Sequence, residues 1–163
     1  MYVEGYFDVL IFQIFLLKYL KNNYKNWLEL YNHIGIFHLG GDCFTDLLYT
    51  IPDDPYRKIV ILDGDKKDNI GITMGKIKRT KEVSPVKFMI IQSFYDKDIS
   101  MNKSDCPIYL LTLKKIEDYL DPIPSNKKDG YLIADSMNKV PEEFCRIFKF
   151  LLVDLKDYKL PLN

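Results

Sequence analysis

The sequence is poor in the residues that build covalent or zinc-centred frameworks in small proteins. It has only three cysteines, Cys43, Cys106 and Cys145, which are far apart and form no C-x-x-C pair. An odd number of isolated cysteines argues against a disulfide framework and against a thiolate zinc site. This pattern favours a reducing, intracellular setting, and we expect a cytoplasmic protein.

An excess of charge of one sign is also absent, because 23 basic and 23 acidic residues cancel. A strongly basic chain would indicate a nucleic-acid partner, whereas here such a partner must be bound by a local group of charges. The two histidines, His33 and His38, are five residues apart. On one strand they would point to opposite faces, so we expect no shared metal ion between them.

The chain lacks a long hydrophobic run. Its longest apolar stretch, residues 9–20, includes Gln13 and Lys18, whereas a bilayer span needs roughly 20 apolar residues. Glu4 and Asp8 stand where a secretory leader would carry positive charge. We therefore expect no membrane partner and no signal peptide.

Several catalytic motifs are missing as well. No glycine-rich phosphate loop with its lysine is present, which argues against ATP hydrolysis by this chain. No serine or cysteine lies in a recognisable nucleophile motif. An EF-hand is excluded because a loop counted from Asp63 has Asp68 at the glycine position and Met74 at the final glutamate position.

What the sequence does contain is an alternation of strand and helix patterns, with neither repeats nor low-complexity tracts. Strands are predicted at residues 1–3, 33–39, 59–62, 87–92 and 107–113, and helices at 6–22, 43–49 (capped by Asp42), 70–81 and 141–158. Strands that are apolar without alternation are typical of sheets covered on both faces. We predict one α/β domain over residues 1–163, a three-layer, open and mainly parallel sheet with helices on both faces. Residues 1–121 carry the motifs, and 122–163 form a C-terminal loop and amphipathic helix.

Acidic residues follow two of these predicted strands. Glu4 ends the first strand, and Asp63 and Asp65 end the third. Because the carboxyl ends of parallel strands meet at one edge of a sheet, these acids should lie together, and Asp8, one helical turn beyond Gly5, can face the same crevice. Crowded carboxylates either take up protons or bind a cation, and oxygen ligands suit Mg²⁺ or Mn²⁺.

Each of these signals has a plainer interpretation when it stands alone. An Asp-Gly-Asp segment at the end of a strand is often only a cap or a turn. Gly5 and Gly64 lack a Cβ atom, and we expect this to let the chain turn sharply and a ligand approach. The combination of the acids predicts a metal site.

The order of these motifs resembles the TOPRIM domain shared by topoisomerases, bacterial primases and the nucleases of the OLD family (overcoming lysogenization defect). The resemblance rests on VEGYFDVL at residues 3–10, on Gly40 and Gly41 after the second predicted strand, and on ILDGD at residues 61–65. It implies a Rossmannoid, TOPRIM-like sheet. It also implies that Glu4, Asp63 and Asp65 serve metal binding and catalysis, and that Asp8 is the second acid of the first motif.

A later segment, LTLKKIEDYLDP at residues 111–122, resembles the OLD nucleases in particular. It implies that Glu117 is a further metal ligand or an acid that supports the ligands, although a favourable charge in a first helical turn explains it equally well. The gyrase-type EGDSA motif is absent, as are the zinc-binding region and polymerising domain of a primase. The OLD resemblance implies a metal-dependent endonuclease that hydrolyses phosphodiester bonds, with DNA favoured over RNA.

The chain departs from the OLD pattern in two respects. OLD proteins usually carry an ABC-type ATPase ahead of TOPRIM, whereas this chain begins at the first predicted strand. A fragment, a stand-alone version and a subunit of a larger complex with an ATPase all remain open, as does a homo-oligomer. The late catalytic lysine of the family cannot be placed: Lys97, Lys139 and Lys149 are candidates, but an ordinary solvated lysine is the favoured interpretation of each.

A local group of basic residues could bind the substrate. Residues 66–87 include seven basic residues against two acidic ones, and the candidates for phosphate contact are Lys66, Lys67, Lys76, Lys78 and Arg79. A solvated helix face is the alternative. Two other functions remain open: a D-x-D glycosyltransferase, which leaves Glu4, Asp8 and Glu117 without a role, and a non-catalytic TOPRIM module that docks an ATPase or another copy of itself.

Overall fold

The structure is a computed structural model that describes residues 1–41, 44–54, 56–69, 75, 86–91, 105–153 and 155. Several predictions made above lie outside these residues. They are the cap at Asp42, nearly all of the helix at 70–81, and the basic residues Lys76, Lys78 and Arg79.

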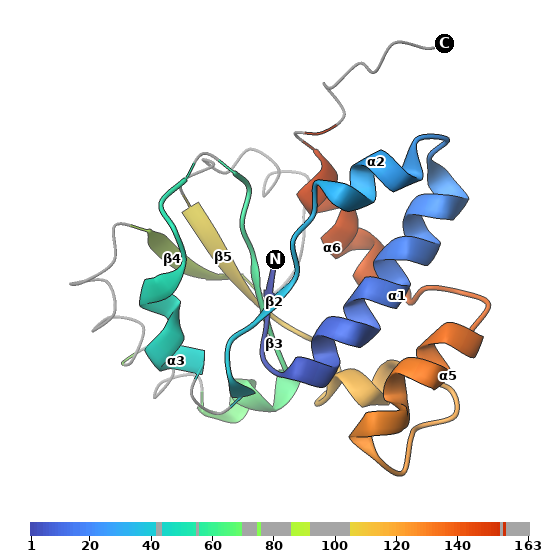
Figure 1. The fold of residues 1–163 in the computed structure, drawn as a ribbon. Coiled ribbons are helices and arrows are strands. Elements are labelled where there is room, and N and C mark those ends of the chain that lie inside the picture. The colour runs from blue at the N-terminus through green and yellow to red at the C-terminus, as the bar shows by residue number, and fades with distance from the viewer. Residues whose placement is uncertain are drawn as a thin grey trace.

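Five strands form one parallel sheet in the order β2-β1-β3-β5-β4 (Figure 1). They are β1 (Tyr2–Val3), β2 (Phe37–His38), β3 (Val60–Leu62), β4 (Lys87–Ile91) and β5 (Asp105–Leu110). Every pairing between them is parallel, which confirms the predicted α/β class. Because β1 lies beside β3, with Val3 opposite Ile61, the residues that follow these two strands lie next to each other.

Helices pack on both faces of the sheet (Figure 1). One face is covered by α1 (Tyr6–Asn23), α2 (Trp27–Asn32), α5 (Gly130–Ser136) and α6 (Glu142–Leu152). The other face is covered by α3 (Phe44–Leu47) and the 3₁₀ helix η2 (Leu48–Thr50). Successive residues near β3 divide between the two cores: Ile59 and Ile61 contact the α1 side, whereas Val60 and Leu62 contact the α3 side. This explains why the strand is apolar without alternation.

Helix α1 is apolar nearly all round because it is enclosed by other elements. Phe12 packs against Phe144 of α6 with ring centroids 4.7 Å apart, and Phe15 packs against the same ring at 5.0 Å. The one lysine in the middle of α1, Lys18, donates hydrogen bonds to the carbonyl groups of Ala134, Asp135 and Met137 at the end of α5. Its ammonium group thereby satisfies orphan helix carbonyls.

Several elements differ from the sequence prediction in their bounds, among them β5, which covers Asp105–Leu110 and not residues 107–113. The second strand covers only Phe37–His38 and not residues 33–39, and His33 instead caps the end of α2, a helix that the prediction lacked. The predicted loop after residue 122 contains α5, whose seven residues bury only Gly130 and Ala134 and so give little periodic signal. Helix α6 ends at Leu152, several residues before the predicted end. None of the described helices combines the length and the apolar character that a membrane crossing requires.

Candidate acid site at the carboxyl edge of the sheet

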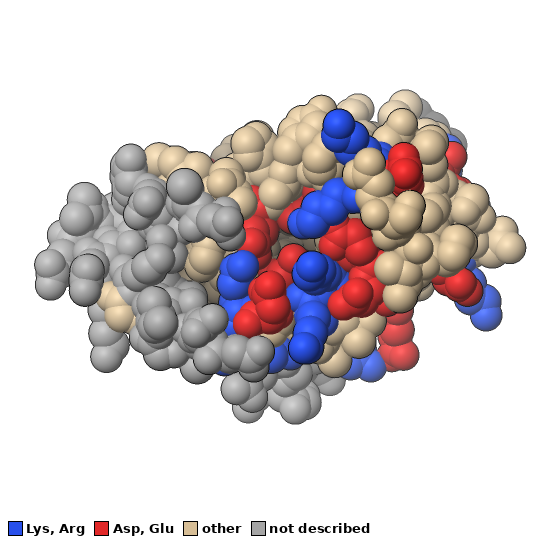
Figure 2. All heavy atoms as spheres, turned by 90° about the horizontal axis from the view of Figure 1, so that it is seen from below, with Lys and Arg blue, Asp and Glu red and all other residues tan. Residues whose placement is uncertain are grey.

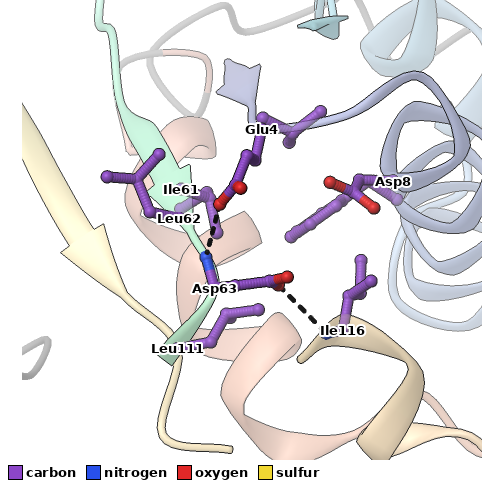
Figure 3. Close-up of a pocket in the computed structure, with 9 residues that line it drawn as sticks. Glu4, Asp8, Ile61, Leu62, Asp63, Leu111 and Ile116 are labelled. Carbon is purple, nitrogen blue, oxygen red and sulfur yellow. Dashed lines mark hydrogen bonds between the residues drawn. The ribbon is translucent and has the colours of Figure 1, made fainter. Parts of the chain in front are cut away.

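The site begins where β1 and β3 end side by side. Glu4 directly follows β1, and Asp63 directly follows β3. The backbone N–H of Asp63 donates to Oε2 of Glu4 over 3.4 Å, so that the glutamate bends toward the neighbouring strand (Figure 3). The structure therefore brings Glu4 and Asp63 together, as the rule for parallel strands predicted.

Asp8 reaches the same place from the first turn of α1. Its Oδ2 atom accepts a hydrogen bond of 2.7 Å from the backbone N–H of Gly5, which satisfies one of the free donors at the start of the helix. Its Oδ1 atom is buried and has no hydrogen-bond partner within the described part of the chain. One oxygen of Asp8 thus caps the helix, while the other is left free beside Glu4 and Asp63.

Asp63 also fixes a second acid in position. Its Oδ1 atom accepts a 3.1 Å hydrogen bond from the backbone N–H of Ile116 (Figure 3), the first residue of the 3₁₀ helix η5 (Ile116–Tyr119). Glu117 follows immediately and is only 7 % exposed. Neither of its carboxylate oxygens has a hydrogen-bond partner among the described residues, although Nζ of Lys127 lies 3.4 Å from Oε1.

A lysine side chain already lies among these acids. Nζ of Lys66, in the 3₁₀ helix η3 (Gly64–Asn69), is 3.0 Å from Oε1 of Glu4 and 3.5 Å from Oδ1 of Asp65. The ammonium group therefore bridges two of the predicted metal ligands. All five predicted acids thus gather at one edge of the sheet, with Asp65 joined to the group through Lys66.

The crowding of these acids changes their protonation. Burial, followed by the charges of Asp8 and Glu4, raises the pKa of Asp63 from 3.8 to about 7. Burial is also the main cause that raises the pKa of Asp8 to about 6, with Glu117 and Glu4 adding to the rise, while the hydrogen bond from Gly5 and the charge of Lys127 oppose it. Around neutral pH the site therefore holds part of its charge as bound protons.

Gly64 has a different role from the one expected. A Cβ atom at this position would lie 2.1 Å from the carbonyl oxygen of Leu113 and 2.4 Å from that of Leu111. The absence of a side chain therefore allows the turn after β3 to pack against the segment that follows β5, and the expectation that it admits a ligand at this point is wrong. The same packing places Asp65, whose N–H donates to the Lys114 carbonyl at 3.0 Å.

The acids surround a shallow pocket with an apolar floor. Its lining comprises Val3, Glu4, Asp8, Phe12, Ile61, Leu62, Asp63, Leu111 and Ile116, and it leaves no enclosed space for a water-sized sphere. On the outer surface, acidic and basic side chains gather around a hollow in the same face of the molecule (Figure 2).

The donor set suits a hard divalent cation in its chemistry but not in its present spacing. All the candidates are carboxylates, and Asp8 and Glu117 offer oxygens without hydrogen-bond partners. Yet no three acids, histidines or cysteines in the described ranges are close enough together to hold a metal ion. The metal roles of Glu4, Asp8, Asp63, Asp65 and Glu117 therefore stay predictions.

A second lysine beside these acids, Lys127, was not singled out from the sequence. Lys127 lies at the start of the 3₁₀ helix η6 (Lys127–Asp129), with its side chain 52 % exposed, and its charge interacts with Glu117, Asp8 and Asp63. The sequence-based candidates Lys139 and Lys149 are exposed, and Lys97 lies outside the described residues. No local pattern marks Lys127, because it comes to the site through the packing of α5 on α1.

The predicted phosphate-binding residues are only partly described. Lys66 is engaged with Glu4 and Asp65, and Lys67 is exposed with Nζ 3.5 Å from the Thr112 carbonyl oxygen. These two lysines and Lys127 are the cations that the structure places near the acids.

A second carboxylate, Glu143 at the start of α6, is bound in a very different way. Its Oε1 atom accepts hydrogen bonds from the Tyr109 hydroxyl at 2.6 Å, the Thr112 N–H at 2.8 Å and the Thr112 hydroxyl at 3.1 Å. Its Oε2 atom accepts one from the Tyr119 hydroxyl. Glu143 was not among the predicted site residues. Its hydrogen bonds join α6 to β5 and η5.

Comparison of the chain with protein-family models, with curated proteins and with solved structures finds no match. The acid site is therefore defined by its own geometry.

Proposed function

We propose that the chain is a divalent-metal-dependent nuclease domain of the TOPRIM type, most similar to OLD endonucleases, that hydrolyses phosphodiester bonds in DNA. The observation that carries the proposal is the meeting of Glu4 and Asp63 at the ends of adjacent strands, with the free oxygens of Asp8 and Glu117 beside them. Carboxylates in excess of their hydrogen-bond donors are a costly arrangement for a fold, and they are typical of sites that act on a ligand.

In this proposal, Glu4, Asp63 and Asp65 are the first candidates to hold Mg²⁺ or Mn²⁺, and Asp8 and Glu117 complete the acidic surround. A bound pair of such ions would supply an activated water and stabilise the leaving oxygen. Binding requires Asp63 to release the proton that its raised pKa retains near neutral pH. It also requires Lys66 to leave Glu4, which frees its ammonium group for a substrate phosphate.

The remaining groups would position the substrate and move protons. Glu4 could act as the general base instead of holding a metal ion, because its side chain is partly exposed at the edge of the site. Lys127 is half exposed and faces Glu117, so it can neutralise phosphate charge on that side. An ABC-type ATPase, in the same chain or as a subunit, and a second copy of the chain are the partners that the OLD resemblance adds.

A second candidate, a non-catalytic module that docks an ATPase, is favoured by one observation. Lys66 already supplies a positive charge to Glu4 and Asp65, and within the described residues the acids do not form a three-ligand group. A module of this kind would keep the lysine in place and would bind no divalent ion.

Metal titration followed by a cleavage assay separates the two candidates. We expect calorimetric binding of Mn²⁺ and nicking of plasmid DNA with Mg²⁺ or Mn²⁺, and we expect Asp63→Ala and Glu4→Ala to lower the cleavage rate by on the order of 100-fold or more. Glu142→Ala is the matched control, because this acid is exposed on α6 and forms an ion pair with Arg146, away from the acid site.

Two outcomes would contradict the nuclease. If either acid variant cuts as the wild type does, that residue has no catalytic role. If the wild type binds no divalent ion and cuts no DNA, the docking module is the better description. Circular dichroism of each variant confirms that the fold is retained.

A further inference from the structure

An exposed pair of aromatic rings borders the acid site. Tyr6, the first residue of α1, lies between Glu4 and Asp8 in the sequence, and its side chain is 58 % exposed. Its ring centroid is 6.1 Å from that of His38, which is also exposed, at an interplanar angle of 82°. His38 ends β2 and stands opposite Val3, the residue before Glu4. The two rings are therefore held on the elements that place the acids.

The geometry of this pair leaves aromatic surface free. In an edge-to-face contact, one of the two rings offers only its edge, so the pair covers at most one face of one ring. Tyr6 makes a second contact of this kind with the ring of Phe7, with centroids 5.6 Å apart, and is still 58 % exposed. The neighbouring residue of β2, Phe37, points to the opposite face of the sheet, is 56 % exposed, and has its ring 5.6 Å from that of Tyr2. An open groove of about 250 Å³ runs beside it, lined by Tyr2, Phe37, His38, Leu39, Leu47 and Thr50.

The charges around the acids complement this surface. Lys66, Lys67 and Lys127 supply cations, and the aromatic pair supplies faces on which a planar group can stack. Cations that follow a phosphate backbone together with exposed aromatic rings are the combination that binds single-stranded nucleic acids. A base inside a duplex is covered on both faces by its neighbours, so only an unpaired base can use Tyr6 or His38.

We infer that Tyr6 and His38 form a stacking surface for an unpaired base, and that the strand held at the acid site is single-stranded or frayed. The inference rests on the proposed nuclease function and names its substrate class. Tyr6 and His38 take part in no chemical step. Their rings hold the base of the nucleotide whose phosphate lies at the acids.

Fluorescence anisotropy with a labelled single strand of about 12 nucleotides, and with the blunt duplex of the same sequence, tests this inference. The protein is measured in EDTA and again in Ca²⁺. We expect tighter binding of the single strand than of the duplex. We also expect Tyr6→Ala to weaken single-strand binding by about 10-fold or more, with little change for the duplex.

Two variants serve as controls. Tyr6→Phe keeps the ring and should bind as the wild type does. Tyr56→Ala removes a side chain that is 75 % exposed but precedes β3, at the opposite edge of the sheet, and it should have no effect. The salt dependence of binding should have the same slope in Tyr6→Ala and wild type, because that slope counts phosphate contacts and not stacked bases.

The outcomes separate this inference from the nuclease proposal. Wild-type affinity in Tyr6→Ala, or a preference for the blunt duplex, would overturn the stacking surface whether or not the protein cuts DNA. Loss of single-strand binding in Tyr6→Ala would support it even if no cleavage occurs, and the nuclease proposal alone would then fail. If the wild type binds neither probe, both proposals fall.

Discussion

This small protein has two carboxylate sites, and they differ in the number of hydrogen bonds that their oxygens accept. Glu143 accepts four hydrogen bonds from Tyr109, Thr112 and Tyr119. Asp8 and Glu117 have buried oxygens that accept none within the described chain. The pKa of Asp63 is raised to about 7 by burial and by the neighbouring acids Asp8 and Glu4.

This difference distinguishes an acid that connects elements of the fold from acids that have buried oxygens without hydrogen-bond donors. A carboxylate whose two oxygens both accept hydrogen bonds joins elements and has little capacity for anything else. Carboxylates that repel one another and lack donors reduce the stability of the fold, and such groups persist mainly where a cation or a substrate compensates. We therefore assign a structural role to Glu143, and the proposed chemistry involves Glu4, Asp8, Asp63 and their neighbours instead.

The largest loss of folding stability should come from substitution of Glu143, the acid whose oxygens accept hydrogen bonds. Glu143→Ala leaves the hydroxyl groups of Tyr109 and Tyr119 without their acceptor, and we expect it to lower the free energy of unfolding by about 2–3 kcal/mol. Urea denaturation measures this change. Glu142→Ala, the exposed neighbour on α6, should leave the transition midpoint unchanged. Equal stability of the two variants would remove the structural role of Glu143.

The acid site should respond to substitution in the opposite direction. Without divalent ions, Asp63 has a pKa of about 7 in the folded protein against an ordinary value of 3.8, so the folded state retains a proton that the unfolded chain releases. The stability contributed by this group is therefore full below about pH 4 and declines as the pH rises toward 7.

Asp63→Asn removes this titration and keeps an oxygen that accepts from the N–H of Ile116. At pH 8 in EDTA we expect the variant to be more stable than the wild type, by on the order of 2–3 kcal/mol, and the two to converge near pH 4. Thermal melts across this pH range check the prediction. A variant less stable than the wild type at pH 8 would show that Asp63 is as well satisfied as Glu143.

The smallest effect concerns Lys66, whose ammonium group lies beside Glu4 and Asp65. In the proposed metal site, a divalent ion would have to displace Lys66 from Glu4 and Asp65, so Lys66→Gln should tighten Mn²⁺ binding severalfold, in line with the modest strength of partly exposed ion pairs. Calorimetric titration measures the dissociation constant. Lys67→Gln is the control, since this neighbouring lysine is exposed and its Nζ lies 3.5 Å from the Thr112 carbonyl oxygen. Weaker Mn²⁺ binding in Lys66→Gln would mean that this lysine does not compete with the ion.

The sequence predicted those parts of the site that depend on strand order. Apolar residues 59–62 mark a central strand, and acids that directly follow two parallel strands must meet. The parts that it missed depend on contacts between distant residues. The bond from Ile116 to Asp63 spans 53 residues, and the charge of Lys127 interacts with Asp8 and Asp63, which lie far from it in the sequence. The short helix α5 was missed and the strand β2 was predicted too long, because few of their residues are buried.

Gly64 sets a limit on how the site could be remodelled. A Cβ atom at Gly64 would collide with the carbonyl groups of Leu111 and Leu113. The turn that carries Asp63 and Asp65 therefore packs closely against the segment that leads to Glu117. Redesign toward a larger ion or a bulkier phosphate ester would have to begin at residues 4–8, where the opposite wall meets solvent. One wall of the site is closely packed, and residues 4–8 are the part that an engineer could reshape.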